Sequence, residues 1–235
     1  PILGTTATAR EIAHPFSVCS WNTDMYGMRD NAAAQAYYDS VCRLYADWGV
    51  DFIKCDDICV TEFRKWDDPY NGPGTRPVHR SLQNCGREVV LSLSPGPADI
   101  TNLPHLRRHA QMWRMTGDFW DRWDKLHDMF DRCKTWEGVP GPGCWPDCDM
   151  LPVGRLCKDA PYHGAQNRMS NFTPDEVRTM FTLWGIFRSP LFLGGDLPEM
   201  PADVLAMLTN GDYLQMHATS YGARELLRRE TNGRA

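Results

Sequence analysis

Several carboxylates in this sequence directly follow short apolar segments, where they could take part in nucleophilic or acid–base chemistry. The apolar run 50–55 leads into Lys54-Cys55-Asp56-Asp57. A carboxylate at the end of a strand can act as a nucleophile. A lysine two residues earlier lies on the same strand face, where its charge favours the ionised carboxylate. Asp56 could equally be a solvated loop residue, and Asp57 is better explained as a structural residue.

A second carboxylate, Asp118, comes four residues after Arg114 in the segment 113–118 (WRMTGD). A general acid must stay protonated until the substrate binds, and an apolar wall such as Trp113 or Trp120 favours the protonated form. The alternative is that Asp118 caps a helix that begins near Trp120.

Two further acids, Asp147 and Asp149, lie around a proline-constrained turn in the segment 145–151 (WPDCDML). They could bind the hydroxyl groups of a ligand or a divalent cation, or they could shape the turn. Together with Asp56 and Asp57 they could also form a set of oxygen ligands for Mg²⁺, which would indicate a metal-dependent enzyme.

The composition narrows the class of function. Apolar residues make up 42% and charged residues 23%, as in ordinary globular proteins. The formal charge of −5 argues against nucleic acid as a partner, because phosphate binding needs a basic face. No apolar run approaches the roughly 20 residues that a membrane-spanning helix needs. Cys55 and Cys59, and also Cys144 and Cys148, have C-x3-C spacing, but no histidine pair completes a zinc site, so we expect neither a metal nor a cofactor.

Short apolar runs alternate along the chain with longer segments of helical periodicity. We predict strands at 50–55, 88–94, 111–115 and 190–193, a further apolar segment at 150–153, and helices at 32–48, 120–133, 174–187 and 201–208. Gly49 is predicted to end the first of these helices, and Thr173 with Glu176 to form a capping box at the start of the third.

Repeated strand–helix units call for a parallel sheet, either doubly wound or closed into a barrel. No Gly-x-Gly-x-x-Gly follows any predicted strand, which weakens a dinucleotide-binding fold. Polar residues at the ends of four strands favour a (β/α)8 barrel, because barrel enzymes build their sites from the carboxyl ends of several strands. These residues are Lys54 and Asp56, Ser92 and Ser94, Arg114 and Asp118, and Asp147 and Asp149.

Five segments in order carry a resemblance to a known family. They read WGVDFIKCDD, VVLSLSPG, MWRMTGDFWD, CWPDCDMLPVG and FTPDEVRTMFTLWGIFRSPLFLGGDL. This series resembles glycoside hydrolase family 27, the α-galactosidase (melibiase) family, over nearly the whole chain. The segments SLSPG and WNTDMYG (21–27) are similar to its bacterial branch.

The resemblance implies a retaining exo-glycosidase that releases terminal α-linked galactose by double displacement. It implies that Asp56 is the nucleophile and Asp118 the acid/base. It further implies that the sugar-binding residues are Lys54, Arg114, Asp149, Ser94 and Trp113. The substrate partner it implies is an oligosaccharide or small glycoside with a terminal α-galactosyl-type residue. A homo-oligomer and a secreted or periplasmic location are both compatible with the sequence.

Three departures from the family pattern shape these expectations. Relative to the family, residues 1–235 correspond to strands four to eight of the barrel. We therefore expect a partial catalytic barrel without the family's first three strands or its C-terminal β-domain. We also expect this fragment to be inactive by itself. Ser94 aligns with a glutamate of typical α-galactosidases, and a smaller residue there resembles the α-N-acetylgalactosaminidases. Cys59 lies one residue beyond the family's disulfide cysteine, so that bridge is not carried over.

Besides the metal-dependent enzyme, one alternative from another class is a barrel that binds carbohydrate without catalysis, although the presence of both Asp56 and Asp118 speaks against it. Within the family, the alternatives are an α-N-acetylgalactosaminidase and a β-L-arabinopyranosidase, the latter because that sugar is galactose without its hydroxymethyl arm.

Overall fold

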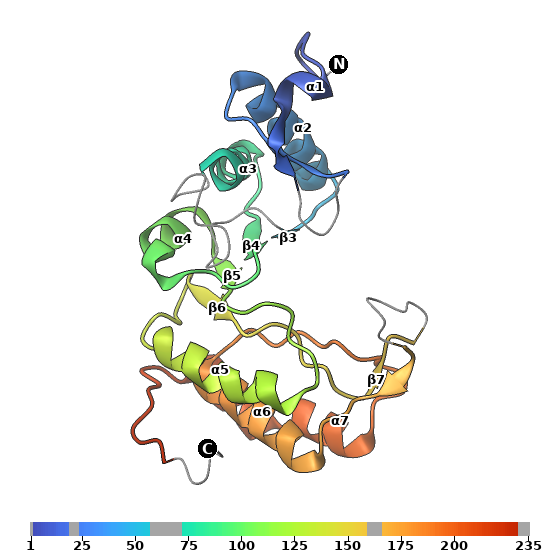
Figure 1. The fold of residues 1–235 in the computed structure, drawn as a ribbon, viewed down its shortest axis with the longest axis vertical. Helices are drawn as coiled ribbons and strands as arrows, with labels where there is room; N and C mark the ends of the chain where they lie inside the picture. Colours follow the sequence, from blue (N-terminus) through green and yellow to red (C-terminus); the bar gives the residue numbers. More distant parts are fainter. Residues whose placement is uncertain (1, 19–23, 57–71, 159–165, 230–235) are drawn as a thin grey trace. The chain divides into compact units, whose positions relative to one another are not determined.

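The computed structural model describes residues 2–18, 24–56, 72–158 and 166–229, which form two compact units, residues 1–114 and 115–235 (Figure 1). Predictions that involve residues 21–23, Asp57 and Cys59 lie outside the described residues. Within the described part of the chain, no helix is long and apolar enough to cross a membrane.

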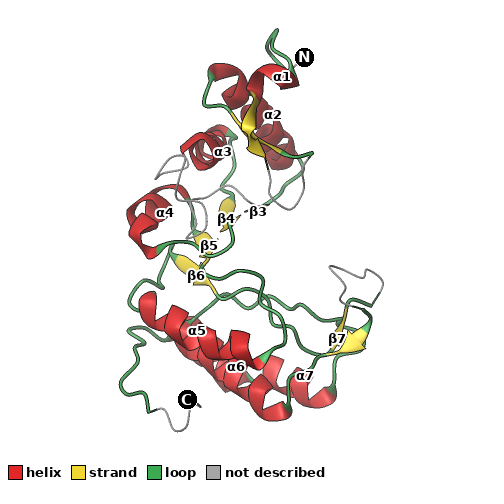
Figure 2. Ribbon diagram, in the orientation of Figure 1, coloured by secondary structure: helices red, strands yellow, loops and turns green. Residues whose placement is uncertain are grey.

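The first unit alternates helices with strands (Figure 2). Its elements are α1 (Ala9–Ile12), β1 (Ala13–Val18), β2 (Tyr26–Met28), α2 (Ala32–Asp47), β3 (Phe52–Asp56), α3 (Gly72–Asn84), β4 (Val90–Ser94), the 3-10 helix η1 (Ile100–Asn102), α4 (Leu103–His109) and β5 (Met112–Arg114). Strands β1 and β2 form an antiparallel pair.

Three parallel strands, in the order β3-β4-β5, form the sheet of the first unit. The predicted strands at 50–55, 88–94 and 111–115 are confirmed as β3, β4 and β5. Each begins one or two residues later than predicted; β5 also ends one residue earlier, and β3 ends one residue later, at Asp56. Leu91 and Leu93 of β4 are fully buried, as expected for the central strand of a parallel sheet.

Helix α2 ends where the sequence predicts. Asn31 caps its first turn by accepting a hydrogen bond from the Ala34 amide at 2.8 Å. Gly49 follows the C-cap with a φ of +79°, in the left-handed region that glycine adopts at low cost. The amide of Gly49 donates to the carbonyl of Ala46 at 2.9 Å, which closes the helix and turns the chain toward β3.

The second unit contains α5 (Trp123–Thr135), β6 (Trp145–Asp147), β7 (Arg155–Leu156), β8 (Arg168–Met169), α6 (Pro174–Phe187), α7 (Ala202–Leu208) and α8 (Gly211–Thr219). Helices α5 and α6 pack side by side (Figure 1). Their contact belongs to an apolar core in which Phe119, Leu126 and Trp184 are almost completely buried.

Helix α6 begins with the predicted capping box. The Glu176 carboxylate accepts the Thr173 amide at 2.7 Å, and the Thr173 hydroxyl accepts the Glu176 amide at 3.3 Å. The predicted helices at 174–187 and 201–208 are thus confirmed, the second starting one residue later.

Two predictions for this unit are wrong in detail. The strand expected at 190–193 is reduced to one parallel bridge, between Leu193 and Leu151. Helix α5 begins at Trp123, not at Trp120, because the residues before it form a loop whose hydrogen bonds include those of Phe119 with Asp149 and of Asp121 with Asn171. Helix α8, held by Arg188 through hydrogen bonds to three carbonyl groups after residue 216, was not predicted.

Candidate functional site

The carboxyl ends of the three parallel strands in the first unit each carry a predicted site residue. Asp56 is the last residue of β3, Ser94 of β4 and Arg114 of β5. The register pairs Asp56 with Ser94, and the Arg114 guanidinium donates a hydrogen bond to the Ser94 hydroxyl at 3.3 Å. The sheet therefore places a carboxylate, a hydroxyl and a guanidinium in one row along one edge.

Lys54 lies on the same face of the sheet as this row. It pairs with Ser92, and both residues stand two positions before the ends of their strands. Because side chains alternate between faces, Lys54 and Asp56 point the same way, as the sequence predicts. Both are solvent-exposed, whereas Ser94 and Arg114 are buried.

Trp113 lies on the opposite face from the row at the strand ends. It pairs with Leu93, and its side chain has no exposed surface. This placement favours a core residue over the predicted sugar contact.

In the second unit, the predicted acids Asp147 and Asp149 form a buried turn at the end of β6. Asp147 is the last residue of the strand, and its carboxylate accepts the amide of Asp149 at 2.8 Å. Asp149 has a φ of +75°, an unusual conformation for a residue with a side chain. Its carboxylate accepts the amide of Phe119 at 2.9 Å, and its carbonyl accepts the Trp184 indole N–H at 3.2 Å.

Asp118 is exposed on the loop that joins β5 to α5. It does not cap α5, because that helix starts five residues later and has Arg122 at its N-cap position. The capping alternative for Asp118 is therefore wrong.

A residue that sequence reasoning missed, Asp121, anchors the far end of this loop. Its carboxylate is buried and accepts two hydrogen bonds from the Arg168 guanidinium, at 2.5 and 2.7 Å, and one from the Asn171 amide at 2.5 Å. Nothing in the local sequence distinguishes Asp121 from its acidic neighbours, because its partners lie almost 50 residues further along the chain.

The described residues contain no group of three or more histidine, cysteine or acidic side chains placed to hold a metal ion. Burial is the main reason that the pKa of the Cys55 thiol is raised, to about 11. A thiol of that kind stays protonated near neutral pH, which makes Cys55 a poor nucleophile and a poor metal ligand.

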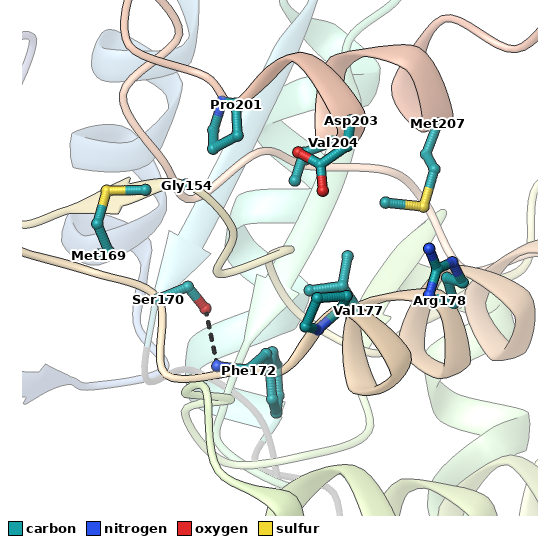
Figure 3. Close-up of a pocket in the computed structure, with 11 residues that line it drawn as sticks. Gly154, Met169, Ser170, Phe172, Val177, Arg178, Pro201, Asp203, Val204 and Met207 are labelled. Atoms are coloured by element: carbon teal, nitrogen blue, oxygen red, sulfur yellow. Dashed lines mark hydrogen bonds between the residues drawn. The ribbon is translucent and has the colours of Figure 1, made fainter.

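A cavity of about 220 Å³ in the second unit lies among α6, α7 and the segment 169–172 (Figure 3). Figure 3 shows Arg178 and Asp203 on its walls beside Val177, Val204 and Met207. None of the predicted site residues lines it. The candidate site residues therefore lie outside this cavity: Lys54, Asp56, Ser94 and Arg114 on the strands of the first unit, and Asp118 on a loop of the second unit.

Strand–helix repeats with polar residues at the carboxyl ends of parallel strands define an incomplete (β/α)8-barrel domain of the enzyme type. A family model described as alpha galactosidase A matches residues 27–218. The chain belongs to this family, the α-galactosidase (melibiase) family of glycoside hydrolases, family 27.

Solved and curated relatives agree with this assignment. A β-L-arabinopyranosidase of family 27 from Geobacillus stearothermophilus is 48% identical, with a TM-score of 0.90, over 97% of this chain and 52% of that structure. An aspartate-to-alanine variant of that enzyme, in complex with arabinose, is 47% identical with the same TM-score and the same coverage of both chains. The alpha-galactosidase D of Emericella nidulans is 27% identical over 86% of this chain and 30% of its own length. The chain thus spans about half the length of the solved relatives and less of the curated one.

Proposed function

We propose that the protein is a retaining exo-glycosidase that removes a terminal sugar of galactose type, with Asp56 as nucleophile and Asp118 as acid/base. The observation that carries the proposal is the row of Asp56, Ser94 and Arg114 at the ends of adjacent parallel strands. Lys54 adds a cation on the same face of the sheet.

The proposed reaction has two displacement steps. Asp56 attacks the anomeric carbon while Asp118 donates its proton to the departing glycosidic oxygen, which gives a covalent glycosyl-enzyme. Asp118, now ionised, takes a proton from water as the water attacks the same carbon, and Asp56 leaves as a carboxylate. Two observations support these roles: both carboxylates are exposed, and Asp118 is not used as a helix cap.

Lys54 and Arg114 are proposed to hold the sugar. Asp56 ends β3, and Asp118 follows β5 in the chain; enzymes of the (β/α)8-barrel type build their sites from residues at the carboxyl ends of several strands. Residues 1–235 contribute strands four to eight of that barrel in the proposal, so the activity belongs to the complete protein.

Among sugars of galactose type, we favour a terminal β-L-arabinopyranoside. The chain is 48% identical to the bacterial β-L-arabinopyranosidase and 27% identical to the fungal α-galactosidase. The two sugars differ only in the hydroxymethyl arm, so α-D-galactoside is the second candidate. The family resemblance places Ser94 near the sugar 2-position, and this small, buried residue makes an α-N-acetylgalactosaminide the third candidate.

The test uses the full-length protein on aryl β-L-arabinopyranoside, α-D-galactoside and α-N-acetylgalactosaminide, with and without EDTA. We expect hydrolysis that EDTA does not affect, a loss of about 10³-fold or more in Asp56→Asn, and a smaller loss in Asp118→Ala that azide relieves with net retention of configuration. Asp175→Asn serves as the matched control, because Asp175 is an exposed aspartate paired with Arg178.

Three results would reject the proposal. They are the absence of hydrolysis with a folded protein, full activity in Asp56→Asn, and loss of activity in EDTA. Loss of activity in EDTA would instead indicate the metal-dependent enzyme.

A further inference from the structure

The loop that carries Asp118 is held by a buried carboxylate from another loop of the second unit, the turn that follows β6. The Asp149 carboxylate accepts the amide of Phe119, the residue directly after Asp118, at 2.9 Å. Asp149 is only 7% exposed, and Phe119 is buried. A hydrogen bond between an ionised acceptor and a buried backbone N–H is both strong and costly to lose.

Asp149 is itself fixed from two sides. Its amide donates to the Asp147 carboxylate at 2.8 Å, and its carbonyl accepts the Trp184 indole N–H at 3.2 Å. Trp184 also packs against the Phe119 ring, with the ring centroids 4.9 Å apart. The turn at Asp149 is therefore a rigid support for the backbone on the C-terminal side of Asp118.

The backbone of Asp149 lies in the left-handed region, with a φ of +75°. Such a conformation is costly for a residue with a side chain and persists where the surroundings require it. Here it accompanies a carboxylate that reaches the Phe119 amide, 30 residues earlier in the chain. Asp121 anchors the other side of the same loop through Arg168.

We infer that Asp149 is a positioning residue for the acid/base: it fixes the Phe119 amide and thereby the direction of the Asp118 carboxylate. This inference rests on the proposed function, and it differs from the sugar contact that the family resemblance implies for Asp149. A positioning residue lowers kcat/KM only for substrates whose leaving group needs a proton from Asp118, because kcat/KM reports the first displacement step, whereas a sugar contact lowers it for every substrate.

The test compares two substrates of the full-length enzyme with the same sugar. One has a poor leaving group, such as a methyl glycoside, and the other has 2,4-dinitrophenolate, which departs without a proton. The variant that removes the carboxylate is Asp149→Gly, because glycine adopts the left-handed conformation without strain. The conservative variant is Asp149→Asn, because asparagine tolerates that conformation and its amide oxygen can accept the Phe119 N–H.

We expect Asp149→Gly to lower kcat/KM by about 10²-fold for the methyl glycoside and by less than about 5-fold for the dinitrophenyl glycoside. Asp149→Asn should regain most of the loss. The double variant Asp118→Ala/Asp149→Gly should be no slower than Asp118→Ala, because residues acting through one group are not additive.

Equal losses for both substrates, or a double variant markedly slower than Asp118→Ala, would overturn the inference in favour of direct sugar binding. If Asp149→Gly does not fold, Asp149→Asn still decides, because a charged sugar contact predicts losses for both substrates.

Failure of the proposed function has a separate signature, which is the absence of hydrolysis by the unaltered enzyme. Amide hydrogen exchange of the segment 116–120 then tests the support directly. Faster exchange in Asp149→Gly than in Asp149→Asn, with α6 unchanged, is expected, and equal exchange in both would overturn the inference.

Discussion

The ion pair between Arg168 and Asp121 gives the sharpest test of how the loop around Asp118 is stabilised. The Asp121 side chain is 1% exposed and that of Arg168 is 31% exposed. Replacing Arg168 with Met keeps most of the side-chain volume but leaves a buried carboxylate with its bond from the Asn171 amide at 2.5 Å. Removing one partner of a buried pair costs about 3–5 kcal/mol, and we expect about 2–3 kcal/mol here because water can reach the vacated Arg168 side.

The matched control is Arg178→Met in the same unit. Arg178 pairs with Asp175, but their side chains are 65% and 94% exposed, so the expected loss is below about 0.5 kcal/mol. In thermal unfolding of the full-length protein, whose solved relatives are about twice as long as this chain, Arg168→Met should lower Tm by roughly 2–6 °C and Arg178→Met by less than about 1 °C. Similar small shifts for both variants would refute the reasoning that Asp121 depends on Arg168.

Two further predictions follow from local contacts in the second unit. The Lys158 ammonium, together with Arg155, lowers the pKa of the exposed Glu199 carboxyl below its ordinary value of 4.5. The ion pair therefore stabilises the fold above that pH, and this stabilisation is lost as the pH falls through the pKa of the folded state. The difference in Tm between the unaltered protein and Glu199→Gln should accordingly vanish in acid. A Cβ on Gly195 would lie 1.9 Å from the Val153 carbonyl oxygen, so Gly195→Ala should lower the free energy of unfolding, measured with denaturant, by more than about 2 kcal/mol. Gly211→Ala is the control: a Cβ there would have nothing within 4 Å, so the free energy of unfolding should change by no more than about 1 kcal/mol.

The features that the sequence predicted well are those that depend on neighbouring residues. The run 88–94 became the central strand β4, because a strand buried on both faces has a nearly continuous apolar sequence. The capping box of Thr173 and Glu176 spans four residues, and Gly49 ends α2 through its own backbone conformation. Each of these signals is complete within one turn or one strand.

The features that escaped prediction depend on distant contacts. Helix α3 contains Pro77 and has two glycines in its first three residues, so its intrinsic helix propensity is poor, and it packs against α2. The strand expected at 190–193 was reduced because a strand needs a partner along its length, and only Leu193 bridges to Leu151. An apolar run shows that a segment is buried and does not show how many of its residues are paired.

The candidate site divides in the same way. The order of polar residues along the strands was enough to place Lys54, Asp56 and Ser94 on one face, because side chains alternate along a strand. Spacing alone could not separate a catalytic Asp118 from a helix cap, because the residues after it have helical apolar periodicity. The chain nevertheless leaves that segment as a loop, since the polar contacts made by Asp149 and Asp121 hold it in another conformation.

Those two contacts explain why the segment after Asp118 forms a loop and not the helix that its apolar periodicity predicts. The Phe119 amide and the Asp121 carboxylate would have different partners if α5 began at Trp120, and two buried carboxylates, Asp149 and Asp121, would then each lose a hydrogen bond. A buried, charged acceptor without its donor costs more than the one turn of helix that the loop gives up. The exposed position of Asp118 therefore depends on buried acids elsewhere in the chain, and for this reason we place the test of the acid/base role at Asp149 as well as at Asp118.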